Sequence, residues 1–88
     1  MPAISLNRIK EQMKKHEDFT SVKASRHGVD FTYARRRLTI REEDGNWYVH
    51  SGNYRLYNLG PKGISLKKIA DEMFFITSNW DQFMQARY

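Results

Sequence analysis

Basic and aromatic side chains alternate with apolar ones through the middle of the chain. If these segments are paired β-strands, one face of the sheet carries arginine, tyrosine and histidine together. We call this set the basic-aromatic face; it comprises Thr39, Arg41, Tyr48, His50, Arg55 and Tyr57. Guanidinium groups bind phosphates, and flat rings stack on unpaired bases at about 1–3 kcal/mol per base. The pattern predicts a surface for single-stranded nucleic acid. The alternative is a solvated sheet face, stabilised by cross-strand pairs of about 0.2–1 kcal/mol each.

Further cations would widen the positive zone. They are Lys23 and part of the run Arg35, Arg36 and Arg37, whose members we expect to point in different directions. No acidic residue occurs from 31 to 41 or from 45 to 70. We therefore expect the basic groups in these segments to lack acidic partners nearby in the sequence.

Three lysines, Lys62, Lys67 and Lys68, surround the expected start of the second helix. Cations at this end of a helix oppose its dipole at a cost of a few tenths of a kcal/mol. The placement makes sense if a phosphate approaches the free N–H groups of the first turn. The alternative is that they are ordinary solubilising lysines, since an exposed helix surface tolerates this cost.

The candidates for catalysis are three histidines. We place His27 in a turn and His16 at a helix end, where the dipole favours a cation. Only His50 lies among cations, which could serve cleavage of a phosphodiester as in small ribonuclease toxins. No second acid or base is visible on its face. The histidines are too dispersed for a metal site, and Glu42-Glu43-Asp44 is typical of a solvated turn.

Two similar hexapeptides predict the helices that flank the sheet, Ile4-Ser5-Leu6-Asn7-Arg8-Ile9 and Ile64-Ser65-Leu66-Lys67-Lys68-Ile69. In each, serine can cap the helix while the flanking isoleucines form a hydrophobic staple. We expect the first helix to continue to about Glu17. The second should break at 77–79, and a short apolar segment should follow.

Between the helices the hydrophobic period changes to two, and three dipeptides suit tight turns: His27-Gly28, Asp44-Gly45 and Gly52-Asn53. Each turn sets the register of its own hairpin. The first pairs Val22 with Tyr33 and Ala24 with Phe31; the second pairs Ile40 with Val49 and Arg41 with Tyr48; the third pairs Val49 with Leu56, Ser51 with Tyr54, His50 with Arg55 and Tyr48 with Tyr57. The inward positions change from odd to even numbers within 34–37, which predicts a bulge or bend there.

These elements predict an α+β fold with the order α-β-β-β-β-α. Its antiparallel meander has a long bent second strand, and both helices pack on one face. The 88 residues carry a formal net charge of +5 and 40% hydrophobic residues. We expect a single small basic domain over 1–88 that folds alone. The chain has no cysteine, no apolar run long enough to span a membrane and no signal peptide. A cytoplasmic, intracellular protein with no membrane association is therefore expected.

The segment Lys67-Lys68-Ile69-Ala70 resembles the Lys-Lys-x-Ala helix start of double-stranded RNA-binding domains, and Leu6-Asn7 is similar to their first helix. The chain differs from that family at Arg8, where an acidic residue is usual, and in having four expected strands rather than three. The resemblance covers a few residues at each end. It implies that Lys67 and Lys68 contact phosphates and that the first helix lies in a minor groove.

Together these patterns predict a non-enzymatic domain that binds nucleic acid, either RNA or single-stranded DNA, with no cofactor and no metal. The expected contacts share positive charge or a flat ring. They are Arg35, Arg36, Arg37, Arg41, Tyr48, His50, Arg55, Tyr57, Lys62, Lys67 and Lys68. One alternative is a small regulator or inhibitor, of the phage or mobile-element type, that docks an acidic protein surface, because interfaces also favour tyrosine, tryptophan and arginine. Another is a small toxin-like ribonuclease that depends on His50.

Overall fold

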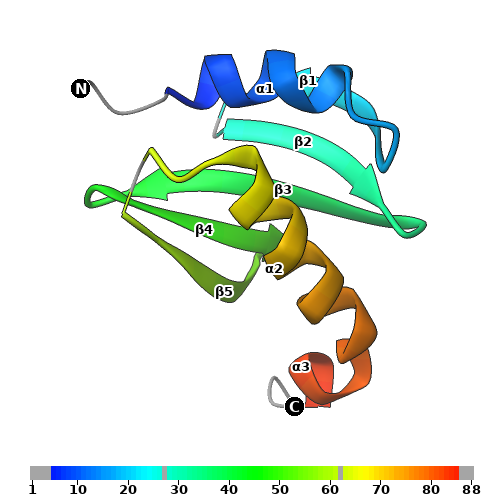
Figure 1. The fold of residues 1–88 in the computed structure, drawn as a ribbon. Coiled ribbons are helices and arrows are strands. Elements are labelled where there is room, and N and C mark those ends of the chain that lie inside the picture. The colour runs from blue at the N-terminus through cyan, green and yellow to red at the C-terminus, as the bar shows by residue number, and fades with distance from the viewer. Residues whose placement is uncertain (1–4, 27, 62, 86–88) are drawn as a thin grey trace.

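The described part of the chain forms one helix, five strands and two further helices in sequence order (Figure 1). The computed structural model describes residues 5–26, 28–61 and 63–85. The elements are α1 (Leu6–Lys14), β1 (Phe19–Ala24), β2 (Gly28–Tyr33), β3 (Arg36–Glu43), β4 (Asn46–Ser51), β5 (Tyr54–Pro61), α2 (Leu66–Ser78) and α3 (Trp80–Gln85). The predicted α+β fold with an antiparallel meander between helices is confirmed. Within the described ranges, no helix has the length and hydropathy needed to cross a membrane.

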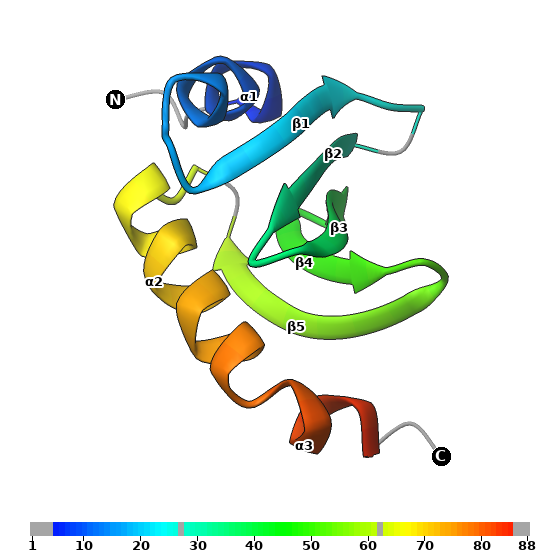
Figure 2. The ribbon, with the colours of Figure 1, turned by 90° about the vertical axis from the view of Figure 1, so that its right-hand side faces the viewer.

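The sheet has the strand order β1-β2-β3-β4-β5. Figure 2 shows that α1 and α2 lie on the same side of it. Helix α1 packs over β1 and β2, and α2 packs against β5. We call the side that faces these helices the inner face and the opposite side the outer face.

Serine caps begin both long helices, as predicted. Ser5 Oγ accepts a hydrogen bond from Arg8 N at 3.2 Å, and Ser65 Oγ accepts one from Lys68 N at 3.3 Å. Residue 4 of the first expected staple lies outside the described residues. Helix α1 ends before the expected Glu17, because the N–H groups of Lys15 and His16 bond to carbonyls three residues back and tighten the last turn.

The core joins the inner face to α1 and α2. Trp47, Val49, Ile40 and Phe31 of the sheet are fully buried, as the expected pattern requires. The helices contribute apolar side chains from one stripe each. These are Ile9 and Met13 from α1 and Ile69, Met73 and Ile76 from α2. The indole N–H of Trp47 donates to Glu42 Oε1 at 3.1 Å, so this buried donor is satisfied.

The long bent second strand is two strands, β2 and β3, joined by a two-residue turn at Ala34-Arg35. Both residues have positive φ, at 51° and 66°, and Tyr33 pairs with Arg36 across the turn. The left-handed conformation costs a residue with a Cβ roughly 1–2 kcal/mol. Neither residue type signals such a turn. The inward-facing positions change from odd numbers in β2 to even numbers in β3, as expected. The change arises because the chain reverses direction at this turn.

The first hairpin is offset from the predicted register. Ala24 pairs with Val29, where Phe31 was expected, because the turn connects Ser25 to Gly28. Farther along β1 the register shifts again, so that Tyr33 pairs with Phe19 instead of Val22. His27 of the expected turn lies outside the described residues.

The second hairpin has the predicted register: Ile40 pairs with Val49 and Arg41 pairs with Tyr48. Asp44 and Gly45 both have positive φ, at 52° and 81°. These residue types suit the type I′ geometry, whose twist matches that of the flanking strands.

The third hairpin begins as predicted and then departs. Its turn pairs Ser51 with Tyr54 and His50 with Arg55, but Val49 then pairs with Tyr57, so the expected pairing of Val49 with Leu56 is wrong. A β-bulge places Leu56 as an extra residue. At a second shift, opposite Trp47 and Tyr48, the extra residue is Leu59, also on β5. Bulges bend a strand and re-aim its side chains, and here the first one changes the face on which Tyr57 lies.

Candidate functional site

The outer face collects most of the polar side chains of the central strands. The paired registers place these side chains on the face opposite the buried residues, whereas α1 and α2 pack on the inner face. The charged, histidine and tyrosine members of the outer face are Lys23, Asp30, Arg37, Arg41, Glu43, Tyr48, His50 and Arg55. Four of these are cations and two are carboxylates, so the outer face is net positive with His50 neutral.

Arg55 is held in place by two partners on this face. Its guanidinium lies 4.1 Å from the centre of the Tyr48 ring, and one of its terminal nitrogens forms an ion pair with Glu43. This partner is not nearby in the sequence, in keeping with the expectation: the carboxylate comes from β3, twelve residues earlier. The Arg55 side chain is still 52% exposed, so its guanidinium remains open to solvent.

His50 occupies the middle of this group and is almost fully buried. Its side chain is 6% exposed, and its Nε2 lies 3.5 Å from Oε1 of Glu43. Burial lowers the pKa of His50, the charges of Arg41 and Arg55 lower it further, and Glu43 opposes the change. The imidazole is therefore neutral at pH 7.

Three nitrogen atoms of the outer face are buried without a hydrogen-bond partner among the described residues. They are Arg41 Nε and both ring nitrogens of His50. An unpaired buried polar group costs about 1–3 kcal/mol, and more if it is charged. The sheet thus retains polar groups at a cost in stability at the place where Arg41, Glu43 and Arg55 converge.

This burial bears on the ribonuclease alternative. A general base must come within hydrogen-bond reach of the proton that it abstracts. The ring nitrogens of His50 are closed off from solvent, so a phosphodiester cannot reach them in this conformation. Glu43 supplies the second titratable group that the sequence did not indicate on this face, but it is engaged with Arg55.

Tyr57 does not lie beside Tyr48. Tyr48 pairs with Asn58, and the ring of Tyr57 packs against Phe75 and Phe83, with centroids 6.2 and 6.0 Å apart. The predicted pairing of the two tyrosines is wrong because the bulge at Leu56 turns Tyr57 toward α2. There its hydroxyl donates to Glu72, which raises the pKa of Tyr57 and lowers that of Glu72.

The three consecutive arginines point in different directions. Arg35 is exposed in the turn, Arg37 is exposed on the outer face, and Arg36 faces α3, where its guanidinium lies 4.2 Å from the centre of the Trp80 ring. Only Arg37 of the run therefore joins Arg41 and Arg55.

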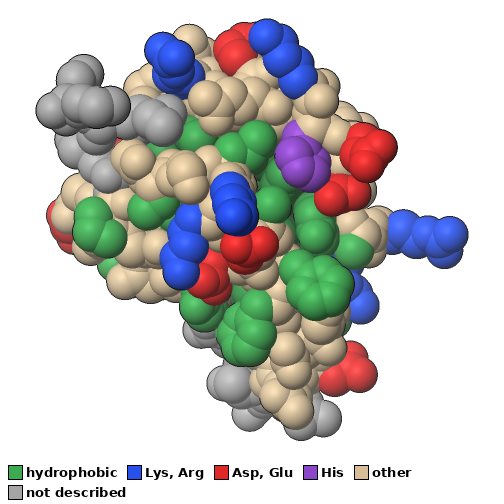
Figure 3. All heavy atoms as spheres, in the orientation of Figure 1, with side chains coloured by type: hydrophobic (Ala, Val, Ile, Leu, Met, Phe, Trp, Pro, Cys, Tyr) green, Lys and Arg blue, Asp and Glu red, His purple; other side chains and the backbone are tan. Residues whose placement is uncertain are grey.

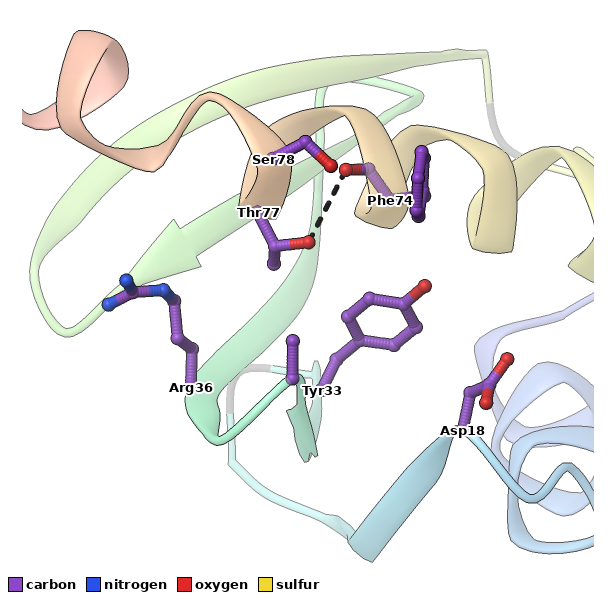
Figure 4. Close-up of a pocket in the computed structure, with 7 residues that line it drawn as sticks. Asp18, Tyr33, Arg36, Phe74, Thr77 and Ser78 are labelled. Carbon is purple, nitrogen blue, oxygen red and sulfur yellow. Dashed lines mark hydrogen bonds between the residues drawn. The ribbon is translucent and has the colours of Figure 1, made fainter.

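A cleft of about 430 Å³ separates the β2–β3 turn from the C-terminal half of α2. Figure 4 shows Tyr33 between Asp18 and the α2 side chains, with Arg36 at the other end. The Thr77 hydroxyl is engaged with the carbonyls of Met73 and Phe74. The cleft lies on the helix side and is separate from the outer face.

The predicted lysines of α2 differ in their surroundings. Both are exposed, but Lys68 forms an ion pair with Glu72 at 3.1 Å, whereas Lys67 has no ion-pair partner in the part of the chain that the structure describes. Lys62 is not among the described residues. The start of α2 thus offers fewer free cations than the sequence predicts, and it lies on the inner side.

Two phenylalanines on α2 are exposed and were not singled out from the sequence. Phe74 is 67% exposed and Phe75 is 48% exposed. In Figure 3, hydrophobic side chains stand out over this part of α2, while acidic and basic side chains are interspersed around its beginning. The helical period indicates this exposure. Met73 and Ile76 fill the buried stripe of α2, so the phenylalanines at the two positions between them cannot both face the core.

Comparison of the chain with known protein families, with curated proteins and with solved structures finds no match. Guanidinium groups bind phosphate and carboxylate oxygens through paired hydrogen bonds. Arg37, Arg41 and Arg55 lie on a surface that no helix of the described residues covers, so they can meet an extended anionic chain.

Proposed function

We propose that the protein binds nucleic acid, RNA or single-stranded DNA, through the outer face of the sheet, and that this role is not enzymatic. The proposal rests on one observation. Four cations, Lys23, Arg37, Arg41 and Arg55, lie together on the outer face, which has only two carboxylates among the described residues. Neutralising phosphates with such cations releases counterions and drives binding without regard to base sequence.

The aromatic contribution comes from Tyr48 alone. Because Arg55 already lies over the Tyr48 ring, a base would stack on the exposed guanidinium or displace it. Guanidinium planes and aromatic rings both stack on bases. We therefore expect one stacking position, and a preference for single strands over duplexes of about 1–3 kcal/mol, the value of one stacked base.

The test compares two exposed arginines that lie on opposite sides of the protein. Arg37 is on the outer face and Arg8 is on α1. Fluorescence anisotropy would measure the binding of labelled RNA and DNA oligonucleotides between about 50 and 200 mM salt, the range over which phosphate contacts weaken steeply. Arg37→Gln should reduce the slope of log K against log salt by about 0.7–0.9, which is the loss of one phosphate contact.

Arg8→Gln changes the net charge equally and should leave this slope unchanged. Equal losses for the two variants would remove the outer face from the proposal. No binding by the parent protein at about 50 mM salt, where non-specific binding is strong, would reject the function. RNA cleavage that disappears in His50→Gln would contradict the non-enzymatic role.

A second candidate function is a regulator that docks an acidic protein. The observation that favours it is the exposure of Phe74, which lines the cleft at Tyr33, and of the adjacent Phe75, because partly apolar surfaces of this kind serve protein contacts. A partner of fixed stoichiometry, retained at moderate salt by the parent protein and lost with Phe74→Ser, would support this candidate. Binding that high salt or nuclease treatment abolishes would support nucleic acid.

A further inference from the structure

Glu43 occupies the cationic centre of the outer face. One of its carboxylate oxygens is paired with Arg55, and the other lies 3.5 Å from the ring of His50. Its side chain is 31% exposed, so it lies between the buried histidine and the solvent-facing arginine. No other carboxylate forms an ion pair with Arg55 in the ranges that the structure describes.

A carboxylate and a phosphate bind an arginine side chain in the same way. Each offers two oxygens to the planar guanidinium fork, so they compete for the same donors. Arg55 is already oriented by the Tyr48 ring, and it would need little reorganisation to exchange one anion for the other. Arg41, whose Nε is buried and unpaired among the described residues, contributes a second positive charge to the same place.

We propose that Glu43 is an internal competitor for phosphate: it occupies Arg55 in the free protein, and nucleic acid binds in exchange for the Glu43–Arg55 ion pair. This inference rests on the proposed function. Glu43 then has a regulatory role. Its carboxylate lowers the affinity of the outer face for phosphate groups, so weakly bound nucleic acid is released more readily. His50 lies on the buried side of the Glu43–Arg55 ion pair, with its Nε2 3.5 Å from Oε1 of Glu43.

Two substitutions with the same change of charge test the role of Glu43. Glu43→Gln removes the competitor, and Asp44→Asn removes the next carboxylate, which is exposed in the β3–β4 turn at a positive φ that asparagine tolerates. Anisotropy with a labelled single-stranded RNA should show Glu43→Gln binding about fivefold more tightly than Asp44→Asn, the equivalent of one exposed ion pair. Thermal unfolding should show Glu43→Gln to be slightly less stable than the parent, since Arg55 loses its partner. A merely structural role for Glu43 would weaken folding and binding together.

A double-mutant cycle assigns the effect to Arg55. In an Arg55→Gln background the difference between Glu43→Gln and Asp44→Asn should disappear, because no guanidinium is left to compete for. Equal affinities of Glu43→Gln and Asp44→Asn, with clear binding by the parent, would overturn the competitor role and leave the proposed function intact. No binding by any variant would overturn both.

Discussion

The two faces of the sheet bury their side chains in different ways. Val49 and His50 are neighbours on β4 and are almost equally buried, at 0% and 4% exposure. Val49 is packed against the helices and leaves no polar group unpaired, whereas both ring nitrogens of His50 lack a hydrogen-bond partner among the described residues. Burial therefore stabilises the inner face and carries a desolvation cost on the outer face. The inner face accounts for the fold, and the outer face is where an external ligand would gain the most.

The largest expected difference between the faces concerns the neighbours Trp47 and Tyr48. Trp47→Ala should reduce the free energy of unfolding by about 3–5 kcal/mol, because it leaves a cavity in the core and removes the hydrogen bond to Glu42. Tyr48→Ala removes only cross-strand contacts and should cost about 0.2–1 kcal/mol. Urea unfolding of the two variants measures both values. Similar costs would mean that the outer face is as tightly packed as the core.

The two tyrosines that the sequence pattern placed side by side should now behave differently. Tyr57 makes two aromatic contacts, each worth about 0.5–1.5 kcal/mol beyond its buried area, so Tyr57→Ala should cost at least about 1–3 kcal/mol. Tyr48→Ala again serves as the control. Nucleic-acid affinity should fall with Tyr48→Ala and not with Tyr57→Phe, which keeps the ring. The opposite pattern would place Tyr57 in the binding surface.

The stability of the protein should fall on mild acidification because of His50. Its pKa is lowered in the folded protein, so below about pH 6.5, the ordinary pKa of histidine, the unfolded chain binds a proton that the folded protein does not. Unfolding then becomes easier as the pH falls from about 7 toward the lowered pKa. The groups around the imidazole are Arg41 and Glu43 from β3 and Arg55 from β5.

Urea midpoints of the parent and of His50→Gln near pH 5.5 and pH 7.5 measure this effect. The parent should lose more stability than His50→Gln on acidification, because only the parent carries the buried imidazole. Identical losses would show that the outer face does not resist protonation, and the contrast with the inner face would then be smaller than the structure indicates.

The smallest expected effect concerns the turn at which the chain changes direction between β2 and β3. Ala34 has φ 51°, a conformation that asparagine adopts more readily than alanine. Ala34→Asn should therefore stabilise the fold by about 0.5–1 kcal/mol. A thermal unfolding midpoint that falls instead would argue against a two-residue turn at this position and favour the continuous bent strand.

The parts of the fold that could be predicted are those with local signals. The β3–β4 register follows from Asp44-Gly45, which suits its turn, and the caps at Ser5 and Ser65 follow from helix-start patterns. The turn at Ala34-Arg35 has no such signal. It forms because pairing of β2 with β3 buries Phe31 and Leu38 together, which outweighs the local cost of positive φ.

The candidate site was less predictable than the fold for two reasons. The bulge at Leu56 leaves no trace in the hydrophobic pattern, since Leu56 and Tyr57 are both acceptable on an inner face. The ion pair between Glu43 and Arg55 joins residues on strands that are not neighbours, and it depends on how far two side chains reach. The positions of Arg41, Tyr48 and His50 on the outer face did follow from the alternation of apolar and polar residues.

Backbone amide chemical shifts test most directly whether nucleic acid binds the outer face. A ¹⁵N-labelled sample titrated with a short single-stranded oligonucleotide should show its largest shifts in β3 and in the neighbouring parts of β4 and β5, around Arg37, Arg41, Tyr48 and Arg55. Shifts along α1 and around Phe74 on α2 should be small. The largest shifts along α1 or α2, with the outer face unchanged, would contradict the account.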